Sequence, residues 1–339
     1  MAPFRFGIVG PGFIAGVIAD ALARSSRARL AAVSSRSLAR AEEFIADRPG
    51  VAAVEGVDAL LDRPDVDAVY VATPTVAKEA IALRAIEAGK HVLVDKPYVD
   101  RASAARMIEA ARSKNLVFMD ATHFVHHPRN AIVRAAIPPR IGEPRSLSTN
   151  FYFPFSDRTN IRFDPKQEPM TAFGDMAWYS MRAIVEYLQP AGAVTKALLA
   201  PEIDPSTGAV VRASGLIAFE DGRVSTFDVG YTAGTILMDL ELLGTSGVIG
   251  MDDFVLDWEG SHVFEGSGDR AGYFYRAGEG TRKDIAFIPT PSAASQATLM
   301  VDDFADLAAS RDRDVLDAHA RATLQTQGYL DALWATLGS

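Results

Sequence analysis

Residues 91–98 of the 339-residue chain read His-Val-Leu-Val-Asp-Lys-Pro-Tyr. The first four form a short β-branched, apolar run, which is typical of a buried parallel strand. Pro97 has no N–H to continue a sheet ladder, so we expect the strand to end at Asp95-Lys96-Pro97. Lys96 is then at the carboxyl end of a strand, where open α/β sheets bind their ligands. For a single lysine considered alone, the alternative is a solvated side chain after an edge strand.

A glycine-rich turn near the N-terminus has the spacing of a dinucleotide-binding site. The apolar run Phe4–Val9 leads into Gly10-Pro-Gly12-Phe13-Ile14-Ala15, and a helical pattern follows over 14–23. This is the G-x-G-x-x-G/A arrangement in its required position, after a strand and at the start of a helix. The first glycine permits the tight turn, the second lets the backbone approach a pyrophosphate, and the helix N-terminus favours phosphate charge. The alternative is an ordinary turn between a strand and a helix.

The end of the second predicted strand indicates which dinucleotide binds. An NAD site usually has Asp or Glu here to bind the adenosine ribose hydroxyls. The strand at 30–33 instead ends in Ser34-Ser35-Arg36-Ser37, and the Ser35 hydroxyl and Arg36 guanidinium suit a 2′-phosphate. The sequence therefore favours NADP, with Arg36 as a plain surface residue as the alternative.

The strand–helix alternation continues through the first third of the chain. Strands are expected at 67–72, 91–94 and 116–119, and helices at 76–88 and 102–113. The first of these strands ends in Thr73-Pro74-Thr75. Repeated strand–helix units predict a doubly wound parallel sheet, which is the α/β Rossmann architecture.

The rest of the chain has a different pattern. Helices are expected at 124–136, 173–188, 294–309 and 315–337, and strands at 145–155 and in succession over 195–264. Hairpin turns are expected at Glu220-Asp-Gly222 and at Gly244-Thr-Ser-Gly247. Strands gathered after a βα half predict an α+β C-terminal domain with a large, mostly antiparallel open sheet. We assign 1–122 to an NADP-binding Rossmann domain and 123–339 to a substrate-binding domain.

The composition disfavours several classes of function. A net charge of −9 argues against a nucleic-acid-binding surface, which needs a basic face. The chain has no cysteine, which excludes disulfides, thiolate metal sites and a cysteine nucleophile. No apolar run approaches the ~20 residues that span a bilayer, and the N-terminus lacks the anatomy of a signal peptide. We expect a cytoplasmic protein that binds neither membrane nor nucleic acid.

Three motifs resemble those of a known family. Gly10-Pro-Gly12, Ala72-Thr-Pro74 and Asp95-Lys-Pro97, each at the end of a different predicted strand, resemble the Gfo/Idh/MocA oxidoreductases. A narrower resemblance is to the branch that contains dimeric dihydrodiol dehydrogenase, NADP-dependent xylose dehydrogenases and glucose–fructose oxidoreductase. The stretches that carry it are Met119–Arg129, Asn160–Arg162 and Phe173–Tyr179.

The resemblance implies roles for particular residues. In that branch a lysine and a tyrosine flank the nicotinamide, and the matching residues here are Lys96 and Tyr179. Asp175 lies four residues before Tyr179 on a predicted helix, so the two share a face. The family also implies a homodimer formed through the C-terminal sheet. The residues expected to bind NADP are Gly10, Gly12, Phe13, Ile14, Ser35, Arg36, Thr73, Pro74, Asp95, Lys96 and Pro97. Those expected to contact substrate are Asp175, Trp178, His127 and Arg162.

Three positions depart from the family pattern. Lys78 stands where the family often carries His, Thr171 where related sequences tend to have Gly, and Asp95 where Glu is usual. Lys78 leaves open whether its position faces the cofactor or the substrate, or adds a cation near the phosphates.

A metal site is the alternative suggested by Asp120, His123, His126 and His127. His123 and His127 would share one helix face, but Pro128 disfavours helical geometry at His127. Histidines in loops also line polyol pockets, where they donate and accept hydrogen bonds. We therefore expect no metal.

The leading functional hypothesis is an NADP(H)-dependent oxidoreductase that moves a hydride between the nicotinamide and a sugar, polyol or vicinal diol. Tyr179 is expected to act as acid/base, assisted by Lys96. The alternative from another class is an NADP(H)-binding sensor without turnover, which has no need of such a pair. A methyltransferase with the same glycine turn is disfavoured, because Asp95-Lys96-Pro97 has no role in it.

Overall fold

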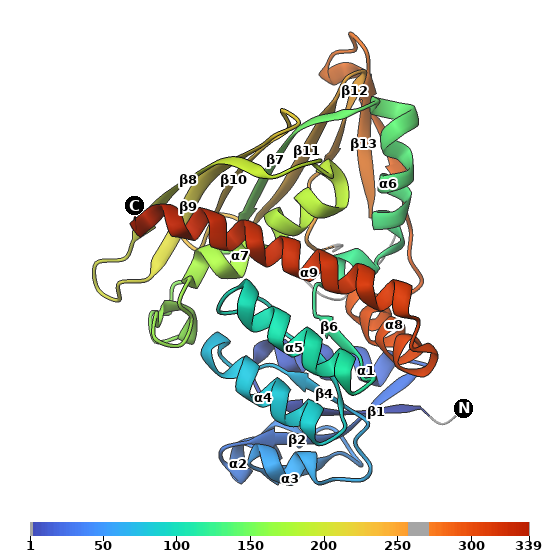
Figure 1. The fold of residues 1–339 in the computed structure, drawn as a ribbon, viewed down its shortest axis with the longest axis vertical. Coiled ribbons are helices and arrows are strands. Elements are labelled where there is room, and N and C mark those ends of the chain that lie inside the picture. Colours follow the sequence, from blue (N-terminus) through green and yellow to red (C-terminus); the bar gives the residue numbers. More distant parts are fainter. Residues whose placement is uncertain (1–2, 257–270, 339) are drawn as a thin grey trace. The chain divides into compact units, whose positions relative to one another are not determined.

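A computed structural model describes residues 3–256 and 271–338 of the chain (Figure 1). Contacts between residues divide the chain into two compact units: 1–123 with 297–324, and 124–296 with 325–339. The domain assignment of 1–122 and 123–339 remains a prediction, and it differs from this division over 297–324. None of the helices in the described ranges combines the length and the apolar character needed to cross a bilayer.

The first unit is built on a six-stranded sheet in the order β3-β2-β1-β4-β5-β6, and each strand runs parallel to its neighbours. The strands are β1 (Phe4–Val9), β2 (Ala28–Ser35), β3 (Ala52–Glu55), β4 (Ala68–Val71), β5 (His91–Val94) and β6 (Phe118–Asp120). The helices between them are α1 (Phe13–Arg24), α2 (Leu38–Phe44), α3 (Val57–Leu61), α4 (Thr75–Glu87) and α5 (Arg101–Ser113). The strand order moves outward from β1 in both directions, so the predicted doubly wound Rossmann sheet is confirmed.

β5 lies inside this sheet, between β4 and β6. All four of its residues are buried, as expected of a parallel strand with both faces covered. The alternative of an edge strand is therefore wrong, and Lys96 follows an interior strand.

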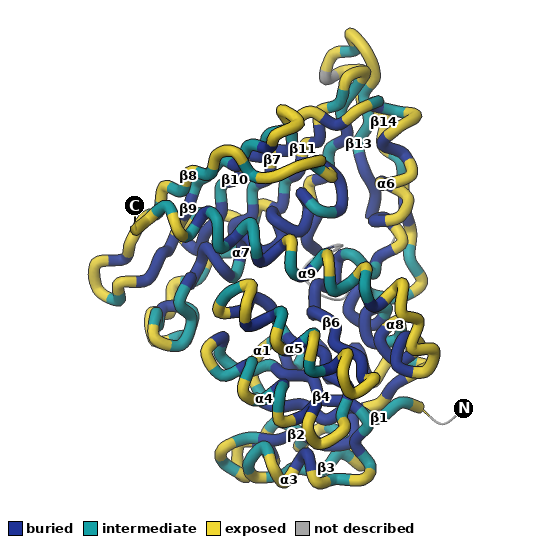
Figure 2. The backbone as a smooth tube through the Cα atoms, viewed as in Figure 1, coloured by how far each residue is buried: buried dark blue, intermediate teal, exposed yellow. Residues whose placement is uncertain are grey.

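Part of the C-terminal tail completes the core of the first unit. Met300, Val301 and Phe304 of α8 (Gln296–Ser310) are fully buried in the same cluster as Phe6 and Ile8 of β1. The rings of Phe6 and Phe304 lie 5.2 Å apart, centroid to centroid. Figure 2 shows the strands of this unit as a buried layer. Burying an apolar side chain of this size contributes roughly 1.5–3 kcal/mol, so α8 is an integral part of the unit.

The second unit is built on an eight-stranded sheet in the order β14-β13-β12-β11-β7-β10-β9-β8. Its pairs are antiparallel except for β7 with β10, so the predicted mostly antiparallel sheet is confirmed. The strands are β7 (Pro144–Tyr152), β8 (Val194–Ile203), β9 (Val210–Phe219), β10 (Val224–Gly230), β11 (Leu237–Gly244), β12 (Gly247–Met251), β13 (Gly272–Ala277) and β14 (Ala286–Pro289).

The two predicted hairpins are both present. Glu220-Asp-Gly222 joins β9 to β10, and Gly222 has a φ of 82°, which favours glycine. Gly244 and Gly247 bracket the turn between β11 and β12. The part of the expected strand succession over 257–264 lies outside the described residues.

The two faces of the large sheet differ. Along β10, Phe227 and Val229 are buried, and the Phe227 ring lies 6.1 Å from that of Phe173 on α7 (Thr171–Ala183). Thr226 and Asp228 point to the opposite side, because side chains alternate along a strand. Helices α6 (Pro128–Ile141) and α7 pack on one face (Figure 1). The opposite face is called the outer face below.

Two predicted helices have different bounds in the structure. The helix expected at 124–136 is wrong at its start, because a 3-10 turn, η1 (His123–His126), precedes α6, which begins at Pro128. Proline suits the first helical position, where its missing N–H would have no helical partner. The helix expected at 173–188 changes after Ala183 into one π-helical turn, η3 (Ile184–Leu188). The final helix, α9, spans Arg313–Trp334.

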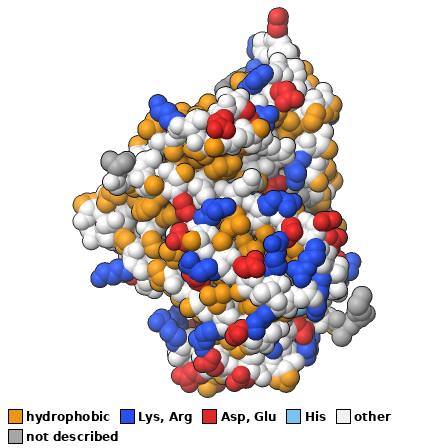
Figure 3. All heavy atoms as spheres, viewed as in Figure 1, with side chains coloured by type: hydrophobic (Ala, Val, Ile, Leu, Met, Phe, Trp, Pro, Cys, Tyr) orange, Lys and Arg blue, Asp and Glu red, His pale blue; other side chains and the backbone are white. Residues whose placement is uncertain are grey.

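Charged side chains of both signs are interspersed on the face of the molecule drawn in Figure 3. Ion pairs such as Arg106–Glu79 and Arg112–Asp317 join elements of the first unit.

Candidate functional site

The glycine turn of the first unit has the geometry that a pyrophosphate requires. Gly10 has a φ of 95°, and a Cβ there would come within 2.9 Å of the Ala72 carbonyl oxygen. A Cβ on Gly12 would meet nothing within 4 Å, so the space in front of this residue is open. Gly12 is the N-cap of α1, whose first turn has no acidic residue and no side-chain cap. The N–H groups at this helix N-terminus can therefore bind a phosphate.

Thr73 supplies a second sign of a nucleotide at this turn. The backbone N–H of Ala72 still donates to Val9 O at 3.0 Å, so the backbone is held to β1 up to the residue before Thr73. Across the described ranges, the Thr73 hydroxyl is one of the few buried side-chain groups without a hydrogen-bond partner. A buried hydroxyl left in this way costs free energy, which a bound polar ligand recovers. The residues at this turn therefore fit a dinucleotide.

The expected 2′-phosphate residues lie at the carboxyl end of β2. Ser35 is the last residue of that strand, and its Oγ accepts a hydrogen bond from Ser37 N at 3.3 Å. Arg36 follows and is exposed. Glu55 on β3 is the register partner of Ser35, so an acidic residue lies on the neighbouring strand rather than at the end of β2, where the sequence has none.

Lys96 is only 8% exposed, at the carboxyl end of β5. The neighbouring strands hold the start of this turn, because Asp95 N donates to Val71 O and Ala121 N donates to Val94 O, both at 3.0 Å. The following two residues, Lys96 and Pro97, are held by Lys78, which is 3% exposed. Its Nζ donates to the carbonyl oxygens of Lys96 at 2.9 Å and Pro97 at 3.0 Å. The Lys78 ammonium therefore bonds the backbone that carries Lys96, and its relation to the cofactor or the substrate remains a prediction.

In the second unit, α7 carries Asp175, Trp178 and Tyr179. Trp178 is fully buried, and Tyr179 is 6% exposed. The Tyr179 ring stands perpendicular to that of Phe151, at 5.3 Å between centroids, and lies 6.2 Å from that of Phe124. The aromatic packing therefore fixes the ring of Tyr179 and the direction of its hydroxyl.

Asp175 lies one turn before Tyr179 and joins two other side chains of its unit. Its carboxylate accepts hydrogen bonds from Arg162 Nε and from the Tyr231 hydroxyl, each at 3.0 Å. Arg162 belongs to η2 (Ile161–Phe163), and its guanidinium lies 4.7 Å from the centre of the Phe155 ring. Burial and the charge of Asp175 raise the pKa of Tyr231 well above its usual value, so this phenol stays a donor.

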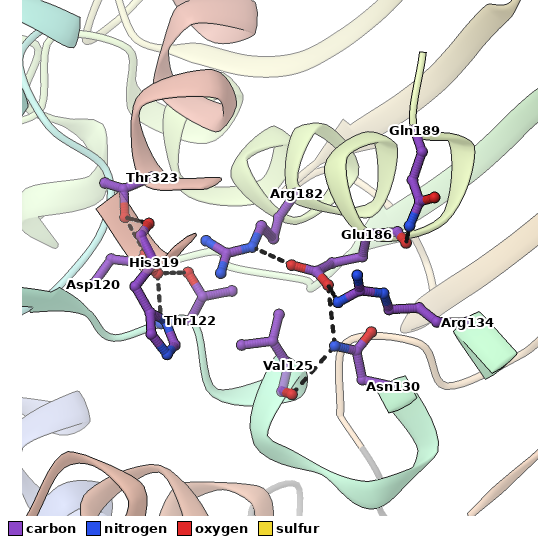
Figure 4. Close-up of polar contacts among 10 residues, drawn as sticks. All are labelled: Asp120, Thr122, Val125, Asn130, Arg134, Arg182, Glu186, Gln189, His319 and Thr323. Atoms are coloured by element: carbon purple, nitrogen blue, oxygen red, sulfur yellow. Dashed lines mark hydrogen bonds and ion pairs between the residues drawn. The ribbon is translucent and has the colours of Figure 1, made fainter. Parts of the chain in front are cut away.

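His127 has a structural role that the sequence did not suggest. It is the N-cap of α6, and its Nδ1 accepts a hydrogen bond from Arg129 N at 3.0 Å. Its expected contact with substrate remains a prediction. Asp120, from the alternative metal site, accepts hydrogen bonds from Thr122 and from Thr323 on α9 (Figure 4). The described residues hold no group of three His, Cys, Asp or Glu side chains placed to bind a metal.

Figure 4 also shows a buried ionic network that sequence reasoning missed. The Glu186 carboxylate accepts hydrogen bonds from Arg182 Nε at 2.9 Å and from Asn130 Nδ2 and Arg134 at 3.2 Å. Only the i,i+4 spacing of Arg182 and Glu186 was visible in the sequence. A second buried ion pair joins Arg129 to Asp253. Both networks fix α6 within the second unit.

Two family models match the chain. Residues 4–122 match a model described as an oxidoreductase family with an NAD-binding Rossmann fold. Residues 138–250 match the GFO/IDH/MocA C-terminal domain. The first match falls in the first unit and the second match in the second unit.

Curated relatives include sugar reductases. The dTDP-3,4-didehydro-2,6-dideoxy-alpha-D-glucose 3-reductase of Streptomyces violaceoruber is 41% identical over 162 residues, which are 47% of this chain and 47% of the relative. The protein of the same name from Saccharopolyspora spinosa is 34% identical over 232 residues, 68% of this chain and 69% of the relative. The chain thus spans about half the length of the first relative and 69% of the second.

The fold is also similar to solved structures. A 3-ketoreductase from Actinomadura kijaniata, in complex with NADP and TDP-benzene, superposes with a TM-score of 0.84 at 26% sequence identity. The match covers 98% of this chain and 97% of that chain.

Proposed function

The chain belongs to the GFO/IDH/MocA oxidoreductase family, and from this premise we propose that it is an NADP(H)-dependent oxidoreductase acting on a sugar. The proposed reaction moves a hydride between the nicotinamide and a ring carbon that alternates between ketone and secondary alcohol. Relatives named as 3-reductases of a dTDP-linked sugar support a keto sugar rather than the wider class of polyols and diols.

The observation that carries the proposal is the nucleotide-side geometry of the first unit. Gly10 and Gly12 leave open space before the uncapped N-terminus of α1, and the buried Thr73 hydroxyl has no partner among the described residues. Arg36, with Ser35, is proposed to bind the 2′-phosphate, because a guanidinium forms charge-assisted hydrogen bonds with phosphate. The complex of the Actinomadura kijaniata relative with NADP supports the same choice of cofactor.

The reaction also needs a proton donor and acceptor. Bound NADPH supplies the hydride. Tyr179 is proposed to donate a proton to the sugar oxygen as the hydride reaches the carbon, and to accept a proton in the reverse direction. Lys96 is proposed to assist, because an ammonium group favours a phenolate and can hydrogen-bond the reacting oxygen. Each of the two side chains is largely buried.

Four residues of the second unit are proposed to shape the substrate side. Asp175 and Arg162 offer a carboxylate and a guanidinium that are partly exposed, which suits hydrogen bonds to sugar hydroxyls. Trp178 and His127 are buried; both are proposed to contact the substrate, and His127 also caps the start of α6.

The test is the loss of NADPH absorbance with a panel of substrates. The panel contains a dTDP-linked 3-keto sugar, the same sugar without the nucleotide, and a simple vicinal diol. Turnover of a keto sugar with NADPH, and much slower turnover with NADH, supports the proposal. Tight NADPH binding without turnover of any substrate would favour the sensor hypothesis instead.

A homodimer through the outer face of the large sheet is proposed as well. Leu198 of β8 and Phe287 of β14 are both exposed. Successive register partners on the strands between them link the two residues across the sheet, so both lie on the same face. The resemblance to the family implies a dimer through this sheet, and these two side chains lie on the face that would pair. Leu198→Asp should shift the sedimentation of the protein toward the monomer, whereas Leu38→Asp on α2 should not. A monomeric wild-type protein would refute the proposal.

A further inference from the structure

Lys78 is a buried lysine at the second helical turn from the start of the nucleotide-side helix α4. Its Nζ donates hydrogen bonds to Thr75 Oγ1 at 3.2 Å, to Lys96 O at 2.9 Å and to Pro97 O at 3.0 Å. An ammonium group has three N–H donors, so these three oxygens suit its charged form. Burying an ammonium is costly unless it is well hydrogen-bonded. The three oxygens therefore offset the cost of burying the ammonium at this turn.

The carbonyl groups of Lys96 and Pro97 belong to the backbone segment that carries the Lys96 side chain. β5 ends at Val94, so Lys96 and Pro97 lie beyond its ladder. A peptide unit is planar, so fixing a carbonyl oxygen fixes the plane to which it belongs. The pyrrolidine ring fixes φ at Pro97. Bonds to both carbonyls therefore hold two successive peptide planes, one on each side of the proline ring.

We propose that Lys78 is a positioning residue, which holds the Lys96-Pro97 turn so that the Lys96 amine points in the direction that the reaction needs. This inference rests on the proposed function, since the role of Lys96 belongs to that proposal. Lys78 itself acts through the backbone. Catalysis is sensitive to such support, because a displacement of about 1 Å can lower a rate on the order of a hundredfold.

Lys90 offers a matched comparison within the same unit. Its Nζ also donates to two backbone carbonyl oxygens, those of Arg63 at 2.9 Å and Val66 at 2.8 Å. Lys90 comes just before β5 and is therefore at the amino end of this strand, whereas Lys96 comes after β5, at its carboxyl end. Parallel sheets bind ligands at the carboxyl ends of their strands. Loss of Lys90 should therefore lower stability without affecting turnover.

The first experiment compares kcat, KM, NADPH affinity and melting temperature in Lys78→Met and Lys90→Gln. Lys78→Met should lower kcat by about ten- to a hundredfold, with the Kd for NADPH changed less than threefold. Lys90→Gln should lower the melting temperature and leave kcat near that of the wild type. A Lys78→Met protein that loses only thermal stability would overturn the proposal. If Lys78→Met does not fold, Lys78→Gln, which keeps two N–H donors, takes its place.

A double-mutant cycle tests whether Lys78 acts through Lys96. In a Lys96→Met background the amine is already missing, so adding Lys78→Met should lower kcat less than twofold further. An equal loss of kcat in both backgrounds would show that Lys78 acts on another group, and would overturn the proposal. The loss of melting temperature should persist in both backgrounds.

An NMR titration separates this inference from the proposed function. In protein labelled with ¹³C at the lysine ε carbon, the Lys96 signal is identified by its absence in Lys96→Met. Lys78→Met should change the chemical shift or the titration of this signal, and Lys90→Gln should not. An unchanged Lys96 signal overturns the inference, whatever the activity. A changed signal in a protein that turns over no keto sugar supports the inference and refutes the proposed function.

Discussion

The Nε of Arg162 lies 3.0 Å from the carboxylate of Asp175, and both side chains are about one quarter exposed. The Tyr231 hydroxyl donates to the same carboxylate oxygen, so Asp175 is held from two sides. Asp175 is therefore fixed one helical turn before Tyr179 and still reaches solvent. A carboxylate held in this way can accept hydrogen bonds from substrate hydroxyls without losing side-chain entropy when it binds.

Asp175→Asn should raise KM for the keto sugar by about tenfold, because a hydrogen bond to a charged group contributes roughly 1.5–3 kcal/mol. The Kd for NADPH should stay close to the wild-type value, since the glycine turn belongs to the first unit. Steady-state kinetics and NADPH titration measure the two quantities. Asp157→Asn, an exposed position whose carboxylate bonds Thr159, is the control. Collapse of NADPH binding with an unchanged KM would contradict the proposed orientation.

Arg36→Asp should weaken NADP(H) far more than NAD(H), because it removes the proposed partner of the 2′-phosphate and adds a negative charge that repels this phosphate. Loss of a charge-assisted contact corresponds to a ten- to hundredfold shift in the ratio of the two Kd values, on the order of 1.5–3 kcal/mol. Fluorescence titration with both cofactors measures this ratio. Arg29→Asp makes the same charge change near the amino end of β2 and should leave the ratio unchanged. Equal affinity of the wild type for NADP⁺ and NAD⁺ would refute the assignment.

Most strands of the first unit were predictable because their signals are local, but β3 (Ala52–Glu55) and α3 (Val57–Leu61) were not predicted. The bounds of β1 and β5 agree with the prediction, since a short apolar run that ends at glycine or proline favours a strand over a helix. The same local chemistry identified both hairpins. Placement of Lys96 at the end of an interior strand followed from these local elements.

The features that sequence reasoning missed depend on contacts between distant residues. The Arg129–Asp253 pair joins residues 124 positions apart, and the return of α8 to the first unit depends on packing against β1. The hydrogen bonds of Lys78 were hidden for the same reason, because their acceptors lie 18 and 19 residues away. At His127 the local signal was present, since a following proline marks a helix start, but histidine is an uncommon N-cap.

Glu186 makes the stability of the second unit dependent on pH. Burial of the Glu186 carboxyl raises its pKa. The charges of Arg182 and Arg134 and the hydrogen bonds from Arg182 and Asn130 together lower it by more, so the pKa falls below the ordinary 4.5. The network therefore contributes stability above about pH 4.5, and this contribution is lost as the pH falls through the lowered pKa. Glu186→Gln should cost about 3 kcal/mol near neutral pH, because it leaves Arg182 buried without its carboxylate.

Urea unfolding of wild type and Glu186→Gln at several pH values measures this effect. The difference in the free energy of unfolding should be largest near pH 7 and shrink as the pH falls below 4.5. Glu143→Gln removes an exposed partner of Arg223 and should cost less than about 1 kcal/mol at any pH. A difference that is constant from neutral to acidic pH would argue against an ionised Glu186.

Tyr179→Phe separates the proposed chemistry from a purely structural role. Loss of the hydroxyl removes the proton donor, so kcat should fall by about 10²–10⁴-fold with NADPH binding nearly intact. Lys96→Met should be comparably damaging, and the double variant little worse than either single one, as for residues that act as a unit. Tyr187→Phe also removes a hydroxyl from a buried ring of the second unit, so it should change the melting temperature and leave kcat near normal. If Tyr179→Phe behaves like Tyr187→Phe, with lower stability and normal kcat, Tyr179 is a core residue and the proton must come from another group.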